Sequence, residues 1–157
     1  MMKKIMKVGI LAGLIAISGY FTNTDAQSVS GSIGKGTVTR GTPSRATVVL
    51  SVPGGLHVNS NRPSGEYMIA TTVRATSNGA KIGAVSYPPG HKRKFEFSEQ
   101  ALNVYEGRVS FGFNVTVPAG FKGNSVPVRV VVKYQACTNQ VCYPPKSKEV
   151  TLTARVK

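Results

Sequence analysis

The chain has 157 residues, with 20 basic and 6 acidic side chains and a formal net charge of +14. Beyond the first 26 residues, no stretch approaches the roughly 20 apolar residues that a membrane-spanning helix needs, so we expect no membrane span. No nucleic-acid-binding motif is present, and no basic and aromatic residues interleave as they do on surfaces that stack bases. We therefore do not expect a nucleic-acid partner.

The first 26 residues have the pattern of a secretory signal peptide. Lys3, Lys4 and Lys7 precede an apolar run from Val8 to Ile17, and small and polar residues then lead to a cleavage point after Ala26. No cysteine lies near this point, so we do not expect a lipid anchor. The pattern predicts export to the periplasm.

The mature domain is expected to comprise residues 27–157. It has 17 basic and 5 acidic residues after removal of the signal peptide, hence a net charge of +12. Such a charge favours binding to acidic proteins, anionic lipid or nucleic acid, or it keeps an exported protein soluble and monomeric. We favour the second interpretation. The size suits a single domain with one core.

Alternating apolar residues predict strands along most of this domain. Residues 27–41 are rich in Gly, Ser and Thr and form either a loose lead-in or an edge strand. The segments with the alternating pattern are 45–52, 56–59, 67–75, 81–87, 108–117, 128–135 and 148–156.

Turn signals separate these strands. Pro53-Gly54-Gly55 predicts a turn, and Ser77-Asn78-Gly79 contains the Asn-Gly pair typical of a hairpin. Residues 91–105 do not alternate cleanly, and residues 98–102 are long enough for no more than one helical turn. Many short strands, frequent turns and no convincing helix predict an all-β sandwich.

The two cysteines of the chain, Cys137 and Cys142, are separated by four residues at the end of the strand predicted over 128–135. In an oxidising compartment such a pair tends to be bridged. If the strand continued, Cys137 would share the parity of Arg129 and Lys133 and lie on a polar face. Pro144 follows closely, which places Cys142 at a turn or strand edge.

A bridge between these cysteines would stabilise the fold only slightly. The ring holds about six residues, for which the loss of chain entropy is worth roughly 2 kcal/mol, against about 4.7 kcal/mol for a 100-residue loop. The small gain favours a role in disulfide exchange over a structural bridge, but the pattern leaves both open.

The segment Tyr-Gln-Ala-Cys-x4-Cys-Tyr-Pro-Pro after a Val-rich strand closely resembles the active-site segment of the N-terminal periplasmic domain of the thiol:disulfide interchange protein DsbD. The resemblance extends upstream through residues 57–63, 80–83, 87–90 and 95–105. It implies an immunoglobulin-like β-sandwich that carries electrons from a thioredoxin-like domain to exported substrate proteins. DsbD continues into a membrane part and a thioredoxin-like domain, so we expect the electron donor here to be a separate protein.

The resemblance also implies roles for individual residues. The cysteine before Tyr-Pro-Pro exchanges with partners, which makes Cys142 the attacking thiol and Cys137 the resolving thiol. Phe95 and Phe97 lie where the family carries a cap loop that shields the cysteines, although their spacing also fits a strand with both rings in the core.

Residues flanking the pair admit two interpretations each. Tyr134 and Tyr143 are candidates for a rim that docks the partner, although the parity of Tyr134 favours the core. The basic cluster Lys92-Arg93-Lys94 would favour a thiolate if it folded over the cysteines, and otherwise it is solvated surface.

Other chemistries have weaker support. A zinc site would need Cys137, Cys142, His57 and His91, but the histidines lack a paired spacing. We interpret His57 as a hydrogen-bonded residue at a strand end rather than as a ligand or base. No cofactor or metal is expected. The alternatives to an exchange protein are a binding or structural module whose disulfide pins a hairpin, and a basic protein that binds anionic surfaces.

Overall fold

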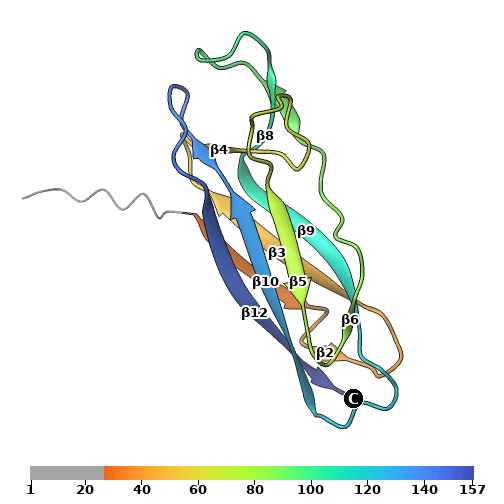
Figure 1. Ribbon diagram of the computed structural model, residues 1–157. Coiled ribbons are helices and arrows are strands. Elements are labelled where there is room, and N and C mark those ends of the chain that lie inside the picture. Colours follow the sequence, from red (N-terminus) through yellow and green to blue (C-terminus); the bar gives the residue numbers. More distant parts are fainter. Residues whose placement is uncertain (1–26) are drawn as a thin grey trace, which may run out of the picture.

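The computed structural model describes residues 27–157, and this part of the chain is built from strands without a helix (Figure 1). Within it, no helix is long and apolar enough to cross a membrane. The predicted signal peptide lies outside the described residues. The strands are β1 (Ser28–Ile33), β2 (Thr37–Val38), β3 (Ser44–Val52), β4 (His57–Asn59), β5 (Thr72–Thr76), β6 (Lys81–Ile82), β7 (His91–Arg93), β8 (Leu102–Tyr105), β9 (Gly107–Thr116), β10 (Ser125–Tyr134), β11 (Ala136–Cys137) and β12 (Lys146–Val156).

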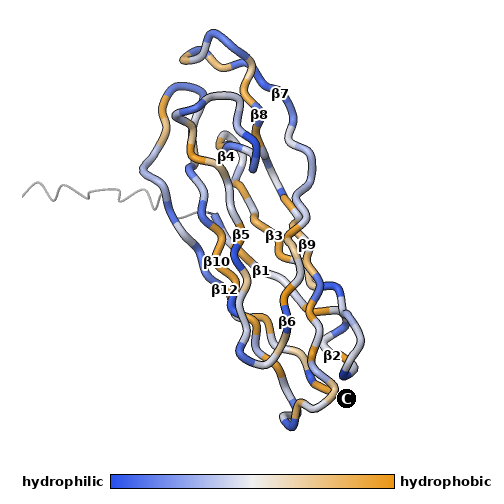
Figure 2. Tube along the Cα trace, turned by 45° about the vertical axis from the view of Figure 1, so that its right-hand side comes forward, coloured by the Kyte–Doolittle hydropathy of each residue, from blue (hydrophilic) through white to orange (hydrophobic). Residues whose placement is uncertain are grey.

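Two four-stranded sheets form the sandwich. One has the order β1-β3-β9-β6 and the other the order β2-β12-β10-β5, with antiparallel pairing except between β2 and β12. Hydrophobic positions recur along the strands of both sheets, with hydrophilic ones between them (Figure 2). This is the alternation expected when each strand turns one side to a shared interior, and it confirms the predicted immunoglobulin-like β-sandwich.

The core lies between these two sheets. β3 contributes Val48 and Leu50, β9 contributes Phe111 and β10 contributes Val130, and all four side chains are buried. At about 25 cal/mol per Å² of apolar surface, each such side chain contributes roughly 1.5–3 kcal/mol when buried. The strands predicted over 45–52, 108–117 and 128–135 are confirmed, and residues 28–33 form the edge strand β1.

Three local predictions were wrong. The segment 67–75 is a strand only from Thr72, because Tyr67 lies in a turn and is 96% exposed. The Asn78-Gly79 pair does not close a hairpin, since β5 pairs with β10 whereas β6 pairs with β9, so the chain crosses between the sheets there. The strand predicted over 81–87 is limited to β6 and an isolated bridge from Ser86 to Gly112.

A third sheet, of order β11-β4-β8-β7, lies at the end of the sandwich away from the C-terminus (Figure 1). β7 and β8 form a hairpin joined by residues 94–101, called here the β7–β8 loop. That loop has turns but no helix, so the helical turn considered for residues 98–102 does not form. This sheet carries the cysteines.

Candidate functional site

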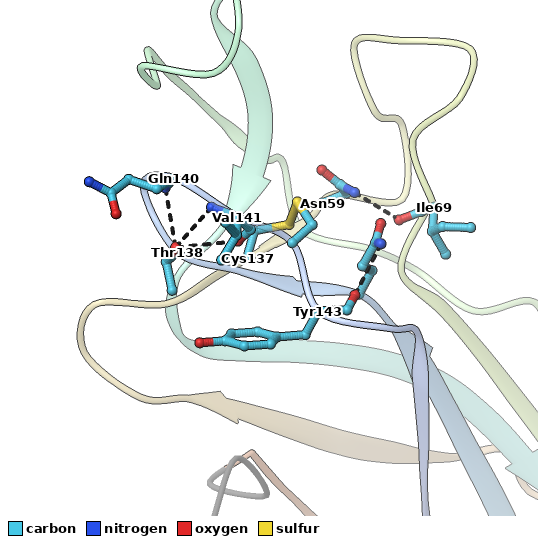
Figure 3. Close-up of a disulfide and its surroundings, with 9 residues drawn as sticks. Asn59, Ile69, Cys137, Thr138, Gln140, Val141 and Tyr143 are labelled. Atoms are coloured by element: carbon cyan, nitrogen blue, oxygen red, sulfur yellow. Dashed lines mark hydrogen bonds between the residues drawn. A yellow bond between two sulfur atoms is a disulfide. The ribbon is translucent and has the colours of Figure 1, made fainter. Parts of the chain in front are cut away.

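Cys137 and Cys142 form a disulfide within a tight hairpin, called here the cystine hairpin (residues 136–143). Their Cα atoms are 3.9 Å apart and form an antiparallel bridge. The turn is closed by Thr138, whose backbone nitrogen donates to the Val141 carbonyl at 2.8 Å and whose Oγ1 accepts from the backbone nitrogens of Gln140 and Val141 (Figure 3). The hairpin is therefore held by hydrogen bonds as well as by the covalent bond.

The two cysteines have different access to solvent. Cys137 is fully buried, with 0% of its surface exposed, whereas Cys142 is exposed. The prediction that Cys137 lies on a polar face was wrong. β10 ends at Tyr134, and Ala136–Cys137 forms a separate strand that pairs with β4 in the third sheet, so the parity of β10 does not continue into it.

His57 lies beside the buried cysteine. In the antiparallel pairing of β11 with β4, His57 is directly opposite Cys137. Directly opposed residues of an antiparallel pair extend their side chains from the same face, with Cβ atoms about 4.5–5.5 Å apart. The side chains of His57 and Cys137 are therefore adjacent on one face of the third sheet.

Phe95 packs against the ring of His57. The two rings stack with centroids 3.9 Å apart and an interplanar angle of 21°, and Phe97 stacks on Phe95 with centroids 5.4 Å apart. Phe95 is 4% exposed and packs with Leu102, whereas Phe97 is 41% exposed. The β7–β8 loop thus lies over the β4 residue that faces Cys137, with one ring buried and one at the surface.

The electrostatic surroundings keep His57 neutral. Burial lowers the pKa of its imidazole to about 4, and the nearby Arg93 and His91 act in the same direction. His57 is 1% exposed, and its Nε2 has no hydrogen-bond partner among the described residues. The expectation of a hydrogen-bonded strand-end histidine was therefore wrong at this nitrogen.

Of the basic cluster, Arg93 is the member that reaches the cystine hairpin. Its guanidinium donates to Asn139 Oδ1 at 3.3 Å, pairs with the Glu106 carboxylate and lies 5.2 Å from the centre of the Phe95 ring. Lys92 donates to the Ser64 hydroxyl, and Lys94 to the carbonyl of a residue in its own loop. One arginine therefore links the β7–β8 hairpin to the cystine hairpin.

The two flanking tyrosines are placed differently. Tyr134 is completely buried in the main core, so the proposal that it forms part of a docking rim was wrong and the alternative from its parity was right. Tyr143 is partly buried against the same core, and its backbone nitrogen donates to the Ala136 carbonyl at 2.8 Å. Tyr143 thus remains at the edge of the cystine hairpin (Figure 3).

Comparison with known families adds to this geometry. The family model described as "Thiol:disulfide interchange protein DsbD, N-terminal" matches residues 32–154, which is most of the chain. The chain belongs to the DsbD N-terminal domain family. The match includes the cystine hairpin, His57 and the β7–β8 loop.

Individual relatives agree with membership of the DsbD N-terminal family. The chain is 26% identical over 148 residues to the thiol:disulfide interchange protein DsbD of Actinobacillus pleuropneumoniae serotype 5b (strain L20), covering 92% of the chain and 22% of that protein. It is 30% identical over 89 residues to DsbD of Pseudoalteromonas atlantica (strain T6c / ATCC BAA-1087), covering 56% of the chain and 14% of that protein. The chain thus spans about a fifth or less of the length of these relatives.

A solved structure shares the fold. The N-terminal periplasmic domain of ScsB from Proteus mirabilis superposes with a TM-score of 0.57 at 13% identity, covering 83% of this chain and 47% of that one. Family membership and a cysteine pair that forms a disulfide together support a role in thiol–disulfide exchange.

Two functional candidates were missed by the sequence interpretation. His57 was judged structural, and Arg93 was treated as one of three equivalent cations. Neither has a local signal that would reveal its neighbour, because the His57–Cys137 and Arg93–Asn139 pairs join distant segments. Among residues 27–157, no group of three or more His, Cys, Asp or Glu side chains is arranged to hold a metal ion.

Proposed function

We propose that this chain is an exported thiol–disulfide exchange module that receives electrons from a thioredoxin-like donor and passes them to exported substrate proteins through Cys137 and Cys142. The observation that carries the proposal is the unequal exposure of the two cysteines. Cys142 is exposed to an incoming thiolate, while Cys137 is buried in the strand of the hairpin that pairs with β4. Exchange needs one accessible sulfur and a second one held nearby to resolve the mixed disulfide.

The electrons balance in two steps. A donor thiolate attacks Cys142 Sγ, the Cys137–Cys142 bond breaks, and the second donor thiol resolves the mixed disulfide, which leaves the donor oxidised and the pair reduced. Cys142 then attacks a substrate disulfide, and Cys137 attacks Cys142 Sγ to release the reduced substrate. Each cycle carries two electrons and restores the disulfide seen here.

The apolar surface at this end of the molecule supports partner docking. The large hydrophobic side chains exposed among the described residues are Tyr67, Phe97 and Val141. Val141 belongs to the cystine hairpin, and Tyr67 and Phe97 line a common surface depression beside the β7–β8 loop. Exposed apolar groups around a reactive sulfur favour contact with a protein partner.

The signal-peptide pattern of residues 1–26 supports a periplasmic location, where disulfides form and persist. The competing proposal is a module whose disulfide only pins the hairpin. The turn bonds of Thr138 and the Tyr143–Ala136 hydrogen bond already close that hairpin, so the bridge adds little to its stability.

The proposal is tested by trapping a mixed disulfide. The oxidised protein is mixed with a thioredoxin that keeps only its attacking cysteine, and the covalent product is digested and mapped by mass spectrometry. We expect a cross-link to Cys142. A cross-link to Cys137 alone, or no adduct beyond that seen with protein whose cysteines were reduced and alkylated beforehand, would overturn the proposal.

A further inference from the structure

Resolution of a mixed disulfide poses a specific problem in this fold. The resolving thiol of Cys137 has to lose its proton before it can attack, because the thiolate is the nucleophile. Its side chain is fully buried, and a charge forms at high cost where water is excluded. A proton acceptor beside Cys137 would lower the cost of forming this thiolate, because the thiolate would form next to the cation that the acceptor becomes.

His57 has the placement that such an acceptor needs. It lies directly opposite Cys137 in the β11–β4 pairing, on the same face of the third sheet. Its ring is held by stacking on Phe95, and its Nε2 is buried without a hydrogen-bond partner in the described part of the chain.

We infer that His57 accepts the proton of the Cys137 thiol during the resolving step. This inference rests on the exchange function proposed above. The Cys137 proton moves to His57 Nε2, and the Cys137 thiolate attacks Cys142 Sγ of the mixed disulfide. The bond between Cys142 and the partner breaks, the Cys137–Cys142 bond forms, and the partner leaves as a thiolate that takes up the proton. When a donor reduces the pair, the same proton moves in the reverse direction.

The charges around His57 suit this role. Burial first, and then the charge of the nearby Arg93 guanidinium, lower the pKa of the imidazole and keep it neutral while the disulfide is intact. Arg93 also reaches Asn139 of the cystine hairpin, and a cation near a thiol favours the thiolate. His91, also near His57, is hydrogen-bonded to Glu106, which pairs with Arg93 as well. Once the thiolate forms beside it, the imidazolium gains an opposite charge, so the ion pair is stabilised relative to either ion alone.

A two-phase reaction with the aromatic disulfide DTNB separates attack from resolution. Attack by Cys142 on DTNB releases the first thionitrobenzoate, and attack by Cys137 on the resulting mixed disulfide releases the second. Stopped-flow absorbance follows both phases in the reduced full-length protein. The Cys137→Ser variant, which should release only the first, assigns the phases.

We expect His57→Phe, which keeps an aromatic ring against Phe95, to slow the second phase by roughly 100-fold at pH 7, the lower end of what a positioned base contributes. The first phase should stay within about threefold. His57→Gln, whose new side chain is polar but has no basic nitrogen, should slow the second phase to the same extent. Since hydroxide replaces the missing base, the second-phase rates of these variants should approach the wild-type rate between pH 7 and pH 9. A packing defect would not produce this pH dependence.

His91→Gln is the matched control, because it removes the second histidine of the same sheet, which does not face Cys137, and its second phase should stay within about threefold of the wild-type rate. Suppose that the wild type shows both phases and that neither His57→Phe nor His57→Gln slows the second one. His57 is then not the proton acceptor, while the proposed exchange function remains supported. If the wild-type protein releases no second thionitrobenzoate, the exchange function itself fails.

Discussion

At the scale of single residues, burial distinguishes two chemically identical side chains. Cys142 is exposed to solvent, whereas Cys137 is buried in the strand that pairs with β4. The same burial acts on His57, whose imidazole stays neutral because the charged form loses its hydration. Position in the fold therefore gives two residues of the same type different access to solvent.

Burial of His57 predicts a pH dependence of stability. Its pKa of about 4 in the folded protein lies below the ordinary 6.5, so the unfolded chain binds the extra proton between these values and the free energy of unfolding falls as pH drops from 6.5 to 4. If the folded protein kept water away from His57, the free energy of unfolding would fall by about 3 kcal/mol over this pH range. Partial hydration of the histidine reduces the expected loss to about 2 kcal/mol.

Urea denaturation of the oxidised protein at pH 7 and pH 4.5 measures this loss. Carboxylates titrate in the same range, so the quantity to compare is the difference between wild type and His57→Phe, which should shrink as pH falls. A difference that is independent of pH would show that the histidine is hydrated in the folded state.

At the scale of structural elements, the β7–β8 loop packs over His57 of β4. Phe95 reaches from its loop onto His57, and Arg93 reaches from β7 to Asn139 of the cystine hairpin. These contacts join two hairpins that are separated by β4 in the order of the third sheet. Displacement of the loop by a partner would uncover the Cys137 side of the disulfide.

The packing of Phe95 on His57 leads us to expect that Phe95→Ala changes the access of reagents to the buried Cys137. In the reduced protein, we expect alkylation of Cys137 by iodoacetamide to be about tenfold faster in the variant, because loss of the ring opens the site to solvent. The already exposed Cys142 should react within about twofold of the wild-type rate. Mass spectrometry of timed samples gives both rates.

Phe97→Ala is the matched control, since Phe97 is 41% exposed and its ring centroid lies 6.4 Å from that of His57, against 3.9 Å for the buried Phe95. It should change the Cys137 rate much less. Equal rates in the wild type and Phe95→Ala would mean that Phe95 does not limit access.

At the scale of the whole molecule, the sandwich has a main core that does not include the two cysteines. Its core lies between the two large sheets, while the cystine closes a small ring in the third sheet at one end. The fold can therefore be expected to tolerate the cycles of oxidation and reduction that exchange requires.

Reduction should leave the protein folded. We expect the free energy of unfolding to fall by about 2 kcal/mol or less, with an unchanged far-ultraviolet circular dichroism spectrum. A glutathione redox series with thiol alkylation should give a reduction potential near the roughly −200 to −230 mV of glutaredoxins. Unfolding on reduction, or a potential below about −300 mV, would instead favour the structural module.

The sequence by itself determined the sandwich and its longest strands. Buried apolar residues recur at every second position within the long strands, as with Val48 and Leu50 of β3, and the series that contain Phe111 of β9 and Val130 of β10 follow the same pattern. A strand with one buried face requires that period whatever its partners. The same parity correctly placed Tyr134 in the core. The family, too, was recognisable from the cysteine motif.

The tertiary structure alone decided which strands pair and what surrounds the cysteines. The Asn78-Gly79 turn joins two sheets rather than a hairpin, and Cys137 changes face because the chain leaves β10 for a different sheet. His57 meets Cys137 although many strands separate them in the chain. Strand pairing depends on contacts between distant segments, which local periodicity does not encode, so the burial of Cys137 and the neighbourhood of His57 appear only once the sheets are assembled.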